Sequence, residues 1–361
     1  MNMKILILTA GNKGGHYSAS LAIVRALKEL DPSLEIINYD SNHLFLGYHG
    51  DGGEQGYITL TTKFRAFWKV FFEFTSFFKG MSNYFLGHAI QRNFKRLLKK
   101  ENPDLILSLH PCFVGCALKR AKKFNTNLPF YVAVLDPIKH SHLWRDKRVN
   151  HTFLPTKETK EAFLKDGFKE DQILQCGFPI SLKEGERKLN PKRKKLLFVN
   201  PSQKGVRTTK KLIEVALKFD VDIDVVTGSD EKLKKYLEKK LPHDEKLRIF
   251  GYVNDMHERL LTSDILLTKA GPNMMFEAVA AHTPVIITGH LLGQEEKNGD
   301  YIVNRGYGYI AETPNILEKV LKKLLIENPD ELEEISKREA CCEDLDGARN
   351  IAKTIIRNLE K

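Results

Sequence analysis

The chain has 361 residues, 42% of them hydrophobic and 29% charged, which is an ordinary composition for a soluble globular protein with two domains. Its five cysteines form no CxxC pair, which argues against a disulfide or zinc framework, and no apolar stretch approaches the ~20 residues that cross a bilayer. The net charge of +11 favours an acidic partner: nucleic acid, anionic lipid or a phosphorylated substrate.

Short β-branched runs alternate with helical patterns along most of the chain. The opening MNMKILILTA predicts a first strand rather than a secretory signal, because a Gly-rich loop and a helix follow at once. Strands are predicted at 4–9, 35–40, 104–110, 129–135 and 151–155, and again at 194–199, 222–227, 247–250, 264–268 and 284–288. Apolar strands separated by amphipathic helices predict parallel sheets covered on both faces. The sequence therefore indicates an α/β protein with two doubly wound domains.

The domain boundary is predicted in the stretch SLKEGERKLNPKRK at 181–194, which is polar and basic and has no apolar periodicity. We assign residues 1–185 to an N-terminal domain and residues 186–344 to a C-terminal domain. A last helix within 345–361 is a candidate to pack back on the first domain.

Residues 41–101 interrupt the alternation as an aromatic, basic insertion. Ten aromatic residues lie between Phe64 and Phe85, and the segment 63–101 has nine Lys or Arg against two Glu. A basic helix with a broad aromatic face is typical of interfacial membrane binding. A helix covering the first sheet is the alternative, and both hold if one face packs and the rest docks. The candidate acceptor or membrane residues are Phe67, Trp68, Lys69, Phe71, Phe72 and Phe78.

The first candidate site follows the first strand, in TAGNKGGHYSAS. Gly11, Gly14 and Gly15 allow a sharp turn before a helix whose N-terminus favours a negative group. The spacing is not GxGxxG, so a dinucleotide fingerprint is absent. His16 is expected at the carboxyl edge of the sheet, where an imidazole can take a proton from a hydroxyl near neutral pH. A capping or surface histidine is the alternative.

The second candidate site is the stretch KAGPNMMFEA at 269–278. Gly271 gives a bend, and Pro272 suits a first helical turn because its missing N–H costs nothing there. The main-chain N–H groups of Asn273 and Met274 are then free for an anion. Glu277 lies on the same helix face as Asn273, where a carboxylate can accept from the two hydroxyls of a ribose. The alternative is a Glu that only complements the helix dipole.

Two further loops are polar at predicted strand ends. Gln294 and Glu295 follow the strand at 284–288, and an amide beside a carboxylate suits the hydroxyls of a sugar. Ser202 and Lys204, in NPSQKG, form a phosphate-compatible loop that is not a P-loop, because no GxxxxGK[ST] occurs. For the first of these loops, a solvated connection into a helix explains the pattern equally well.

Taken together, these loops resemble the processive diacylglycerol glycosyltransferases and monogalactosyldiacylglycerol synthases, relatives of the MurG-type transferases in glycosyltransferase family 28. The resemblance covers nearly the whole chain, and the order of its motifs makes it specific. Its anchors are GGHYSAS (14–20), LHP (109–111), VLDP (134–137), FLPT (153–156), CGFPI (176–180), FGYVNDM (250–256), KAGPNMMFEA (269–278) and GQEEKN (293–298).

The resemblance implies a GT-B fold, in which two Rossmann-like doubly wound domains face each other across a cleft. It implies an inverting hexosyltransferase that takes glucose or galactose from a UDP-sugar and needs no metal or other cofactor. The acceptor is a diacylglycerol-type lipid, and the N-terminal domain docks on the anionic inner face of the cell membrane as a cytoplasmic, peripheral protein. No nucleic acid is expected as a partner.

The resemblance also assigns roles to residues. It implies that Glu277 holds the ribose, and that His16, or a carboxylate it orients such as Asp136, deprotonates the acceptor. The remaining donor residues are Gly271, Pro272, Asn273 and Met274 for the diphosphate, Gln294 and Glu295 for the sugar, Gly251, Tyr252 and Val253 beside the base, and Ser202 and Lys204 for the leaving group.

Departures from the family pattern leave alternatives open. Ala270-Gly271-Pro272 stands where Pro-Gly-Gly is familiar, and Asn12-Lys13 replaces glycine in the first loop. The rivals are a MurG-like transferase of UDP-GlcNAc to a lipid-linked acceptor, a UDP-sugar 2-epimerase and a basic nucleic-acid-binding protein. Aromatics gathered on one helix favour lipid over nucleic acid.

Overall fold

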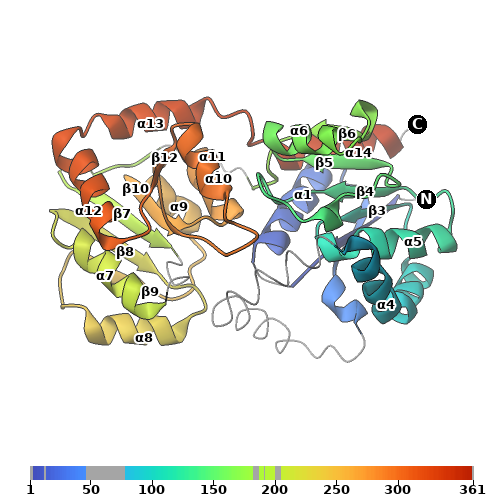
Figure 1. Ribbon diagram of the computed structural model, residues 1–361, viewed down its shortest axis with the longest axis horizontal. Helices are drawn as coiled ribbons and strands as arrows, with labels where there is room; N and C mark the ends of the chain where they lie inside the picture. The colour runs from blue at the N-terminus through green and yellow to red at the C-terminus, as the bar shows by residue number, and fades with distance from the viewer. Residues whose placement is uncertain are drawn as a thin grey trace. The chain divides into compact units, whose positions relative to one another are not determined.

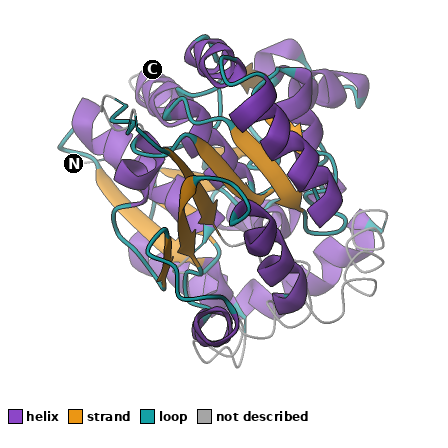
Figure 2. Cartoon of the chain, turned by 90° about the vertical axis from the view of Figure 1, so that its left-hand side faces the viewer, coloured by secondary structure: helices purple, strands orange, loops and turns teal. Residues whose placement is uncertain are grey.

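The computed structural model describes residues 3–11, 14–45, 78–181, 187–190, 192–199 and 205–359. The chain divides into two compact units. The first comprises Met1–Ser181, Leu292–Gln294 and Glu343–Lys361, and the second comprises Leu182–Leu291 and Glu295–Cys342. Each unit contains one six-stranded parallel sheet between layers of helices (Figures 1 and 2).

The sheet of the first unit has the strand order β2-β1-β3-β4-β5-β6. Its strands are β1 (Lys4–Thr9), β2 (Glu35–Asp40), β3 (Leu105–Ser108), β4 (Phe130–Ala133), β5 (His151–Leu154) and β6 (Ile173–Gln175). Its helices are α1 (Gly15–Leu30), α4 (Lys79–Glu101), α5 (Gly115–Phe124), α6 (Lys157–Lys165) and α14 (Gly347–Leu359). All neighbouring strands pair in parallel, so all six carboxyl ends lie at one edge of the sheet.

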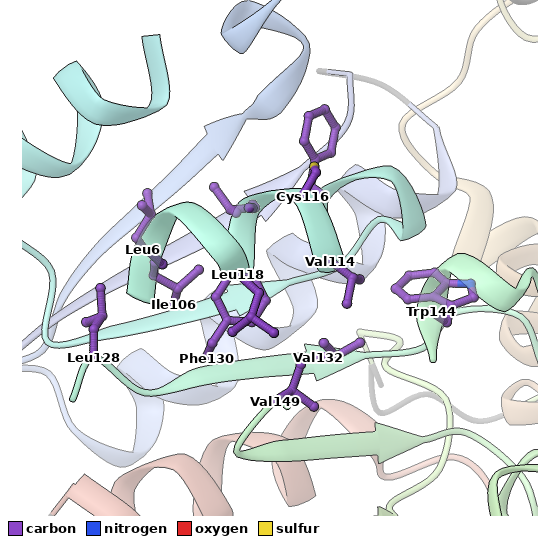
Figure 3. Close-up of a cluster of buried hydrophobic side chains, with 14 of the residues drawn as sticks. Leu6, Ile106, Val114, Cys116, Leu118, Leu128, Phe130, Val132, Trp144 and Val149 are labelled. Carbon is purple, nitrogen blue, oxygen red and sulfur yellow. The ribbon is translucent and has the colours of Figure 1, made fainter. Parts of the chain in front are cut away.

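The core of the first unit forms where α5 covers the sheet. Side chains of β1, β3 and β4 point toward those of α5, as Leu6, Ile106, Phe130 and Leu118 show in Figure 3. All four are almost completely buried. Apolar burial of this kind contributes roughly 25 cal/mol per Å², so this cluster holds the strand ends that carry the polar loops in place.

The sheet of the second unit has the strand order β12-β11-β10-β7-β8-β9. Its strands are β7 (Lys194–Val199), β8 (Val221–Val226), β9 (Leu247–Phe250), β10 (Ile265–Lys269), β11 (Val285–Gly289) and β12 (Gly308–Ile310). Its helices are α7 (Val206–Ala216), α8 (Glu231–Lys240), α9 (Met256–Leu261), α10 (Pro272–Ala280), α11 (Asn298–Asn304), α12 (Pro314–Lys322) and α13 (Glu331–Ala340).

Two strands of the structure are absent from the ten that the sequence predicts. Strands β6 and β12 have three residues each and form one outer edge of their sheets. Segments this short carry too few residues to show an apolar run. The order of strands reverses between β1 and β3 in the first unit and between β7 and β10 in the second, and doubly wound sheets bind ligands at such switch points.

Helix α4 confirms the predicted helix for the second half of the insertion. It buries Ile90, Phe94 and Leu98 against the first unit, while Tyr84 and Phe85 are exposed. Residues 46–77, which include the predicted Phe67, Trp68, Lys69, Phe71 and Phe72, lie outside the described residues. Over the part of the chain that the structure describes, no helix has the length and apolarity needed to cross a membrane.

The last helix, α14, packs against α1 in the first unit. The chain reaches it through a close crossing of two glycines. Gly177 has a φ of +90°, a conformation that only glycine adopts without strain, and a Cβ atom on Gly347 would lie 2.2 Å from the carbonyl oxygen of Gly177. Asn350 secures the crossing by donating from Nδ2 to the carbonyl of Cys176 at 2.9 Å. The crossing therefore leaves no room for a side chain.

We expect Gly347→Ala to destabilise the protein by about 1–3 kcal/mol or more, because the new methyl group must displace main chain rather than a flexible side chain. Gly80→Ala is the matched control, since Gly80 lies in α4 and no neighbouring atom of the described residues lies within 4 Å of an added Cβ. The control should be neutral or stabilising by up to about 1 kcal/mol. Denaturant unfolding measures the free energy of unfolding of both variants. Equal stability of the two would contradict the tight packing of Gly347 against Gly177.

A buried acid lies in α13 of the second unit. The side chain of Glu339 is completely buried, and neither carboxyl oxygen has a hydrogen-bond partner among the described residues. Burial raises the pKa of Glu339 well above its usual value of 4.5, and nearby Arg187 opposes only part of this effect. The folded protein therefore holds this proton more tightly than the unfolded chain does, and stability falls as the pH rises above about 4.5.

Glu339→Gln should make the protein more stable than wild type at pH 8, and the difference should shrink toward pH 4, because glutamine has no charge to bury. Urea unfolding across this pH range measures the effect. Glu333→Gln, an exposed position on the same helix, is the control and should follow the wild-type pH dependence closely. A Glu339→Gln variant that is less stable than wild type at pH 8 would contradict the account.

Candidate functional site

His16 lies at the carboxyl edge of the first sheet, in the first turn of α1. Gly14 precedes the helix with a φ of +90°, and no side chain of the described residues caps the helix start. His16 Nδ1 lies 2.7 Å from the carbonyl oxygen of Leu109, just after β3. Since a carbonyl only accepts, Nδ1 carries the proton and the neutral ring keeps a lone pair on Nε2. Burial lowers the pKa of His16, which keeps this lone pair free at neutral pH.

A second histidine, His110, lies beside the first one. Its ring centroid is 4.8 Å from that of His16, in an edge-on arrangement, and both rings are partly exposed. In the sequence this residue stands out only as part of the LHP motif, which indicates no role for it. The pairing depends on β1 and β3 being neighbours in the sheet, which no local pattern reveals.

Asp136 lies beyond the end of β4 and is almost completely buried. Its Oδ2 accepts from the indole Nε1 of Trp144 at 2.7 Å, and its Oδ1 accepts from Gln294 Nε2 at 3.3 Å. Residues 292–294 belong to the first unit. Gln294, predicted to contact the sugar, thus contacts a predicted catalytic carboxylate, and Trp144 is a partner that the sequence did not indicate.

The second unit has a hollow at the carboxyl ends of β7, β8 and β9. It encloses about 120 Å³, and the described residues lining it are Val199, Val226, Gly228, Tyr252, Val253 and Met256. The side chain of Tyr252 is 73% exposed, so an aromatic face is available beside an apolar hollow. The segment predicted to border a base, Gly251 to Val253, supplies two of the lining residues. An apolar hollow with an exposed aromatic ring is suited to a planar heterocycle.

Helix α10 begins at the switch point of the second sheet. Gly271 is its N-cap and Pro272 its first residue, as predicted, and no side chain of the described residues caps it. The N–H groups of Asn273 and Met274 belong to the first turn, where the helix has no carbonyl to offer them. Glu277 is partly exposed one turn later, while the neighbouring Phe276 is buried in the core. The arrangement presents donors for an anion and, beside them, an acidic acceptor.

Glu295 is held by the second unit itself. Its Oε2 accepts from the main-chain N–H of Leu291 at 2.8 Å, and its Oε1 pairs with Lys269 at the end of β10. Lys269 in turn lies close to the start of α10, since its Nζ would be 3.1 Å from a Cβ on Gly271. The structure thus adds a cation to the predicted site. Sequence reasoning missed Lys269 because its partner follows the next strand, 26 residues later.

Ser202 and Lys204 lie outside the described residues, so their role in holding the leaving group stays a prediction. Phe78 immediately precedes α4 and is exposed. Along α4, exposed Met81, Tyr84 and Phe85 extend the apolar surface that begins at Phe78.

The same helix presents a polar, cationic stretch one to three turns further on. A hollow there is lined by His88, Gln91, Arg92 and Lys95 among the described residues. Exposed aromatics next to cations are the combination expected of a helix that lies on an anionic lipid surface. Membrane docking stays a prediction, and these residues of α4 are the described ones that it concerns.

Known structures share the fold of the whole chain. MurG of Acinetobacter baumannii has a TM-score of 0.61 at 13% identity, covering 98% of this chain and 99% of its own. A UDP-N-acetylglucosamine 2-epimerase has a TM-score of 0.63 at 14% identity, covering 100% and 97%. At these identities the likeness concerns the fold alone. Two Rossmann-like units with polar loops at their carboxyl edges define a protein of the GT-B class, and the predicted fold is confirmed.

Sequence comparison shows which GT-B proteins this chain is similar to. Residues 16–180 match the family described as Monogalactosyldiacylglycerol (MGDG) synthase, and residues 199–355 match the Glycosyltransferase family 28 C-terminal domain. The chain thus combines an N-terminal part of the monogalactosyldiacylglycerol-synthase type with a glycosyltransferase family 28 C-terminal domain, as its motifs predicted. Two similar proteins are named Processive diacylglycerol beta-glucosyltransferase. That of Staphylococcus epidermidis is 28% identical over 87% of this chain and 82% of its own, and that of Staphylococcus aureus strain Newman is 28% identical over 99% and 92%.

Proposed function

We propose that this protein transfers a hexose from UDP-glucose or UDP-galactose to a diacylglycerol-type lipid at a membrane surface, with inversion at the anomeric carbon. The family supports the reaction class, and the names of the similar staphylococcal proteins support the lipid acceptor. The observation that carries the proposal is the start of α10, where uncapped N–H groups lie one turn before the partly exposed Glu277.

The donor binds to the second unit in this proposal. Uracil occupies the hollow beside Tyr252, the ribose hydroxyls donate to Glu277, and the diphosphate lies at the N–H groups of Asn273 and Met274. Lys269 exchanges its partner Glu295 for a phosphate oxygen, which frees a carboxylate for the sugar beside it. Helix start and lysine together stabilise the negative charge that develops on UDP as it leaves, and Ser202 and Lys204 are proposed to assist. In this proposal the leaving group is stabilised without a metal ion.

The acceptor reacts on the first unit. Nε2 of His16 takes the proton of the acceptor hydroxyl as its oxygen bonds to the anomeric carbon, and the bond from that carbon to the UDP oxygen breaks. Asp136, whose carboxylate accepts a hydrogen bond from Trp144, is a second candidate for the base that deprotonates the acceptor. Because burial lowers the pKa of His16, the base stays neutral to a lower pH than a free histidine would.

Docking on the membrane is assigned to the exposed face of α4 and to the residues before it, including the predicted Phe67, Trp68, Lys69, Phe71 and Phe72. The cations of α4 attract anionic headgroups, and its aromatic rings enter the interface. The site of action is accordingly the inner face of the cell membrane.

Transfer of labelled hexose to lipid tests the function, and Glu277→Ala tests the site. Wild type incubated with labelled UDP-glucose or UDP-galactose and diacylglycerol vesicles should form labelled glycolipid. The variant should lose about tenfold or more in kcat/KM for the donor, because a charged hydrogen bond to the ribose is worth about 1.5–3 kcal/mol. Thin-layer separation of the products measures both.

Glu333→Gln, an exposed glutamate on α13 of the same unit, is the control and should match wild type. Release of label only into water would refute the transferase, and interconversion of UDP-GlcNAc without a lipid product would refute it and indicate the epimerase. Transfer of GlcNAc alone would indicate the MurG-like alternative.

Phe85→Ser should weaken binding to vesicles that contain anionic lipid, because a side chain that is 63% exposed loses its place in the interface. Loss of one aromatic ring should reduce the bound fraction severalfold in a sedimentation assay. Ile326→Ser on the second unit removes an apolar side chain of equal exposure, 63%, and serves as control. If both variants bind vesicles as wild type does, α4 is not the docking surface.

A further inference from the structure

The two histidines at the switch point of the first sheet are adjacent rings of opposite hydrogen-bonding character, with centroids 4.8 Å apart. His16 donates from Nδ1 to Leu109 O, which leaves Nε2 as an acceptor. His110 Nδ1 accepts the main-chain N–H of Cys112 at 3.3 Å, so its proton is on Nε2, which is a donor. Neither Nε2 has a hydrogen-bond partner among the described residues. A proton acceptor and a proton donor therefore lie on adjacent rings.

The ring of His110 is fixed in place. It caps a short 3-10 helix, η2 (Pro111–Phe113), and packs between His16 and Phe113, whose ring centroid is 5.6 Å away. Ser108 stabilises the turn by donating to the carbonyl of Phe113 at 3.1 Å. A rigid donor beside a base is the preorganised kind of group that orients a substrate.

The pair also stays uncharged. Burial lowers the pKa of both rings, and the proximity of His16 lowers that of His110 further. When His16 accepts a proton from a substrate, His110 remains a neutral donor, because two charged imidazoles this close repel each other.

We propose that His110 is a second catalytic residue of the acceptor site, which donates from Nε2 to an oxygen on the carbon next to the reacting hydroxyl. His16 then takes the proton while His110 aligns the acceptor through its neighbouring oxygen. The substrate class is an alcohol with a vicinal oxygen, which glycerol lipids and sugars share and simple fatty alcohols lack. The inference rests on the proposed transfer reaction and adds a selectivity for acceptors that have an oxygen next to the reacting hydroxyl.

Two substitutions separate this role from the structural one. His110→Asn keeps an acceptor near Nδ1, and hence the cap on Cys112, but has no donor at the position of Nε2. His110→Gln places an amide N–H near Nε2 and gives up the cap. With diacylglycerol as acceptor, the Asn variant should lose about tenfold in kcat/KM for the acceptor, the value of one hydrogen bond of about 1.4 kcal/mol. The Gln variant should stay within about threefold of wild type.

The readouts distinguish the possible failures. The KM for UDP-sugar and the melting temperature of the Asn variant should match wild type, and its rate with a long-chain alcohol without a vicinal oxygen should also match. Wild-type kinetics of the Asn variant with diacylglycerol, equal losses in both variants, or an equal loss with the simple alcohol would overturn the inference. If wild type itself forms no glycolipid, the proposed function fails instead.

Discussion

Parallel pairing of all strands is the constraint on which the site depends. Because every strand of a unit runs the same way, all carboxyl ends and all following helix starts gather at one edge of its sheet. His16 follows β1, His110 follows β3 and Asp136 follows β4 in the first unit. In the second, Tyr252 follows β9 and α10 follows β10. Residues far apart in sequence become neighbours at an edge where main-chain N–H groups are also free.

An ion pair between Lys269 and Glu295 lies beside the proposed donor site. The first turn of α10 is positive, and Lys269 adds a cation that Glu295 neutralises within the unit. If a diphosphate binds at this helix start and takes over the lysine, the buried Glu295 loses its cation but still accepts from Leu291 N–H. In the proposed donor site, the same exchange frees a carboxylate oxygen for the sugar, so the proposal couples diphosphate binding to sugar binding.

The sequence predicted the fold because its signals are local. Apolar runs located ten of the twelve described strands, and a Gly-Pro pair located the start of α10. Helical spacing put Glu277 on the same face as Asn273, and both residues are partly exposed. His110, Lys269 and Trp144 could not be predicted in this way, because each acts through a partner on another loop whose proximity depends on strand order. The aromatic residues from Phe67 to Phe72 remain a prediction.

The most direct test of the central claim is a calorimetric titration of the wild-type protein with UDP, UMP and uridine. The account predicts that affinity falls in that order, with the larger loss on removal of the β-phosphate, because the diphosphate spans the start of α10 and Lys269. Equal affinities for UDP and uridine, or no binding of UDP at all, would contradict the assignment of this helix start as the diphosphate site.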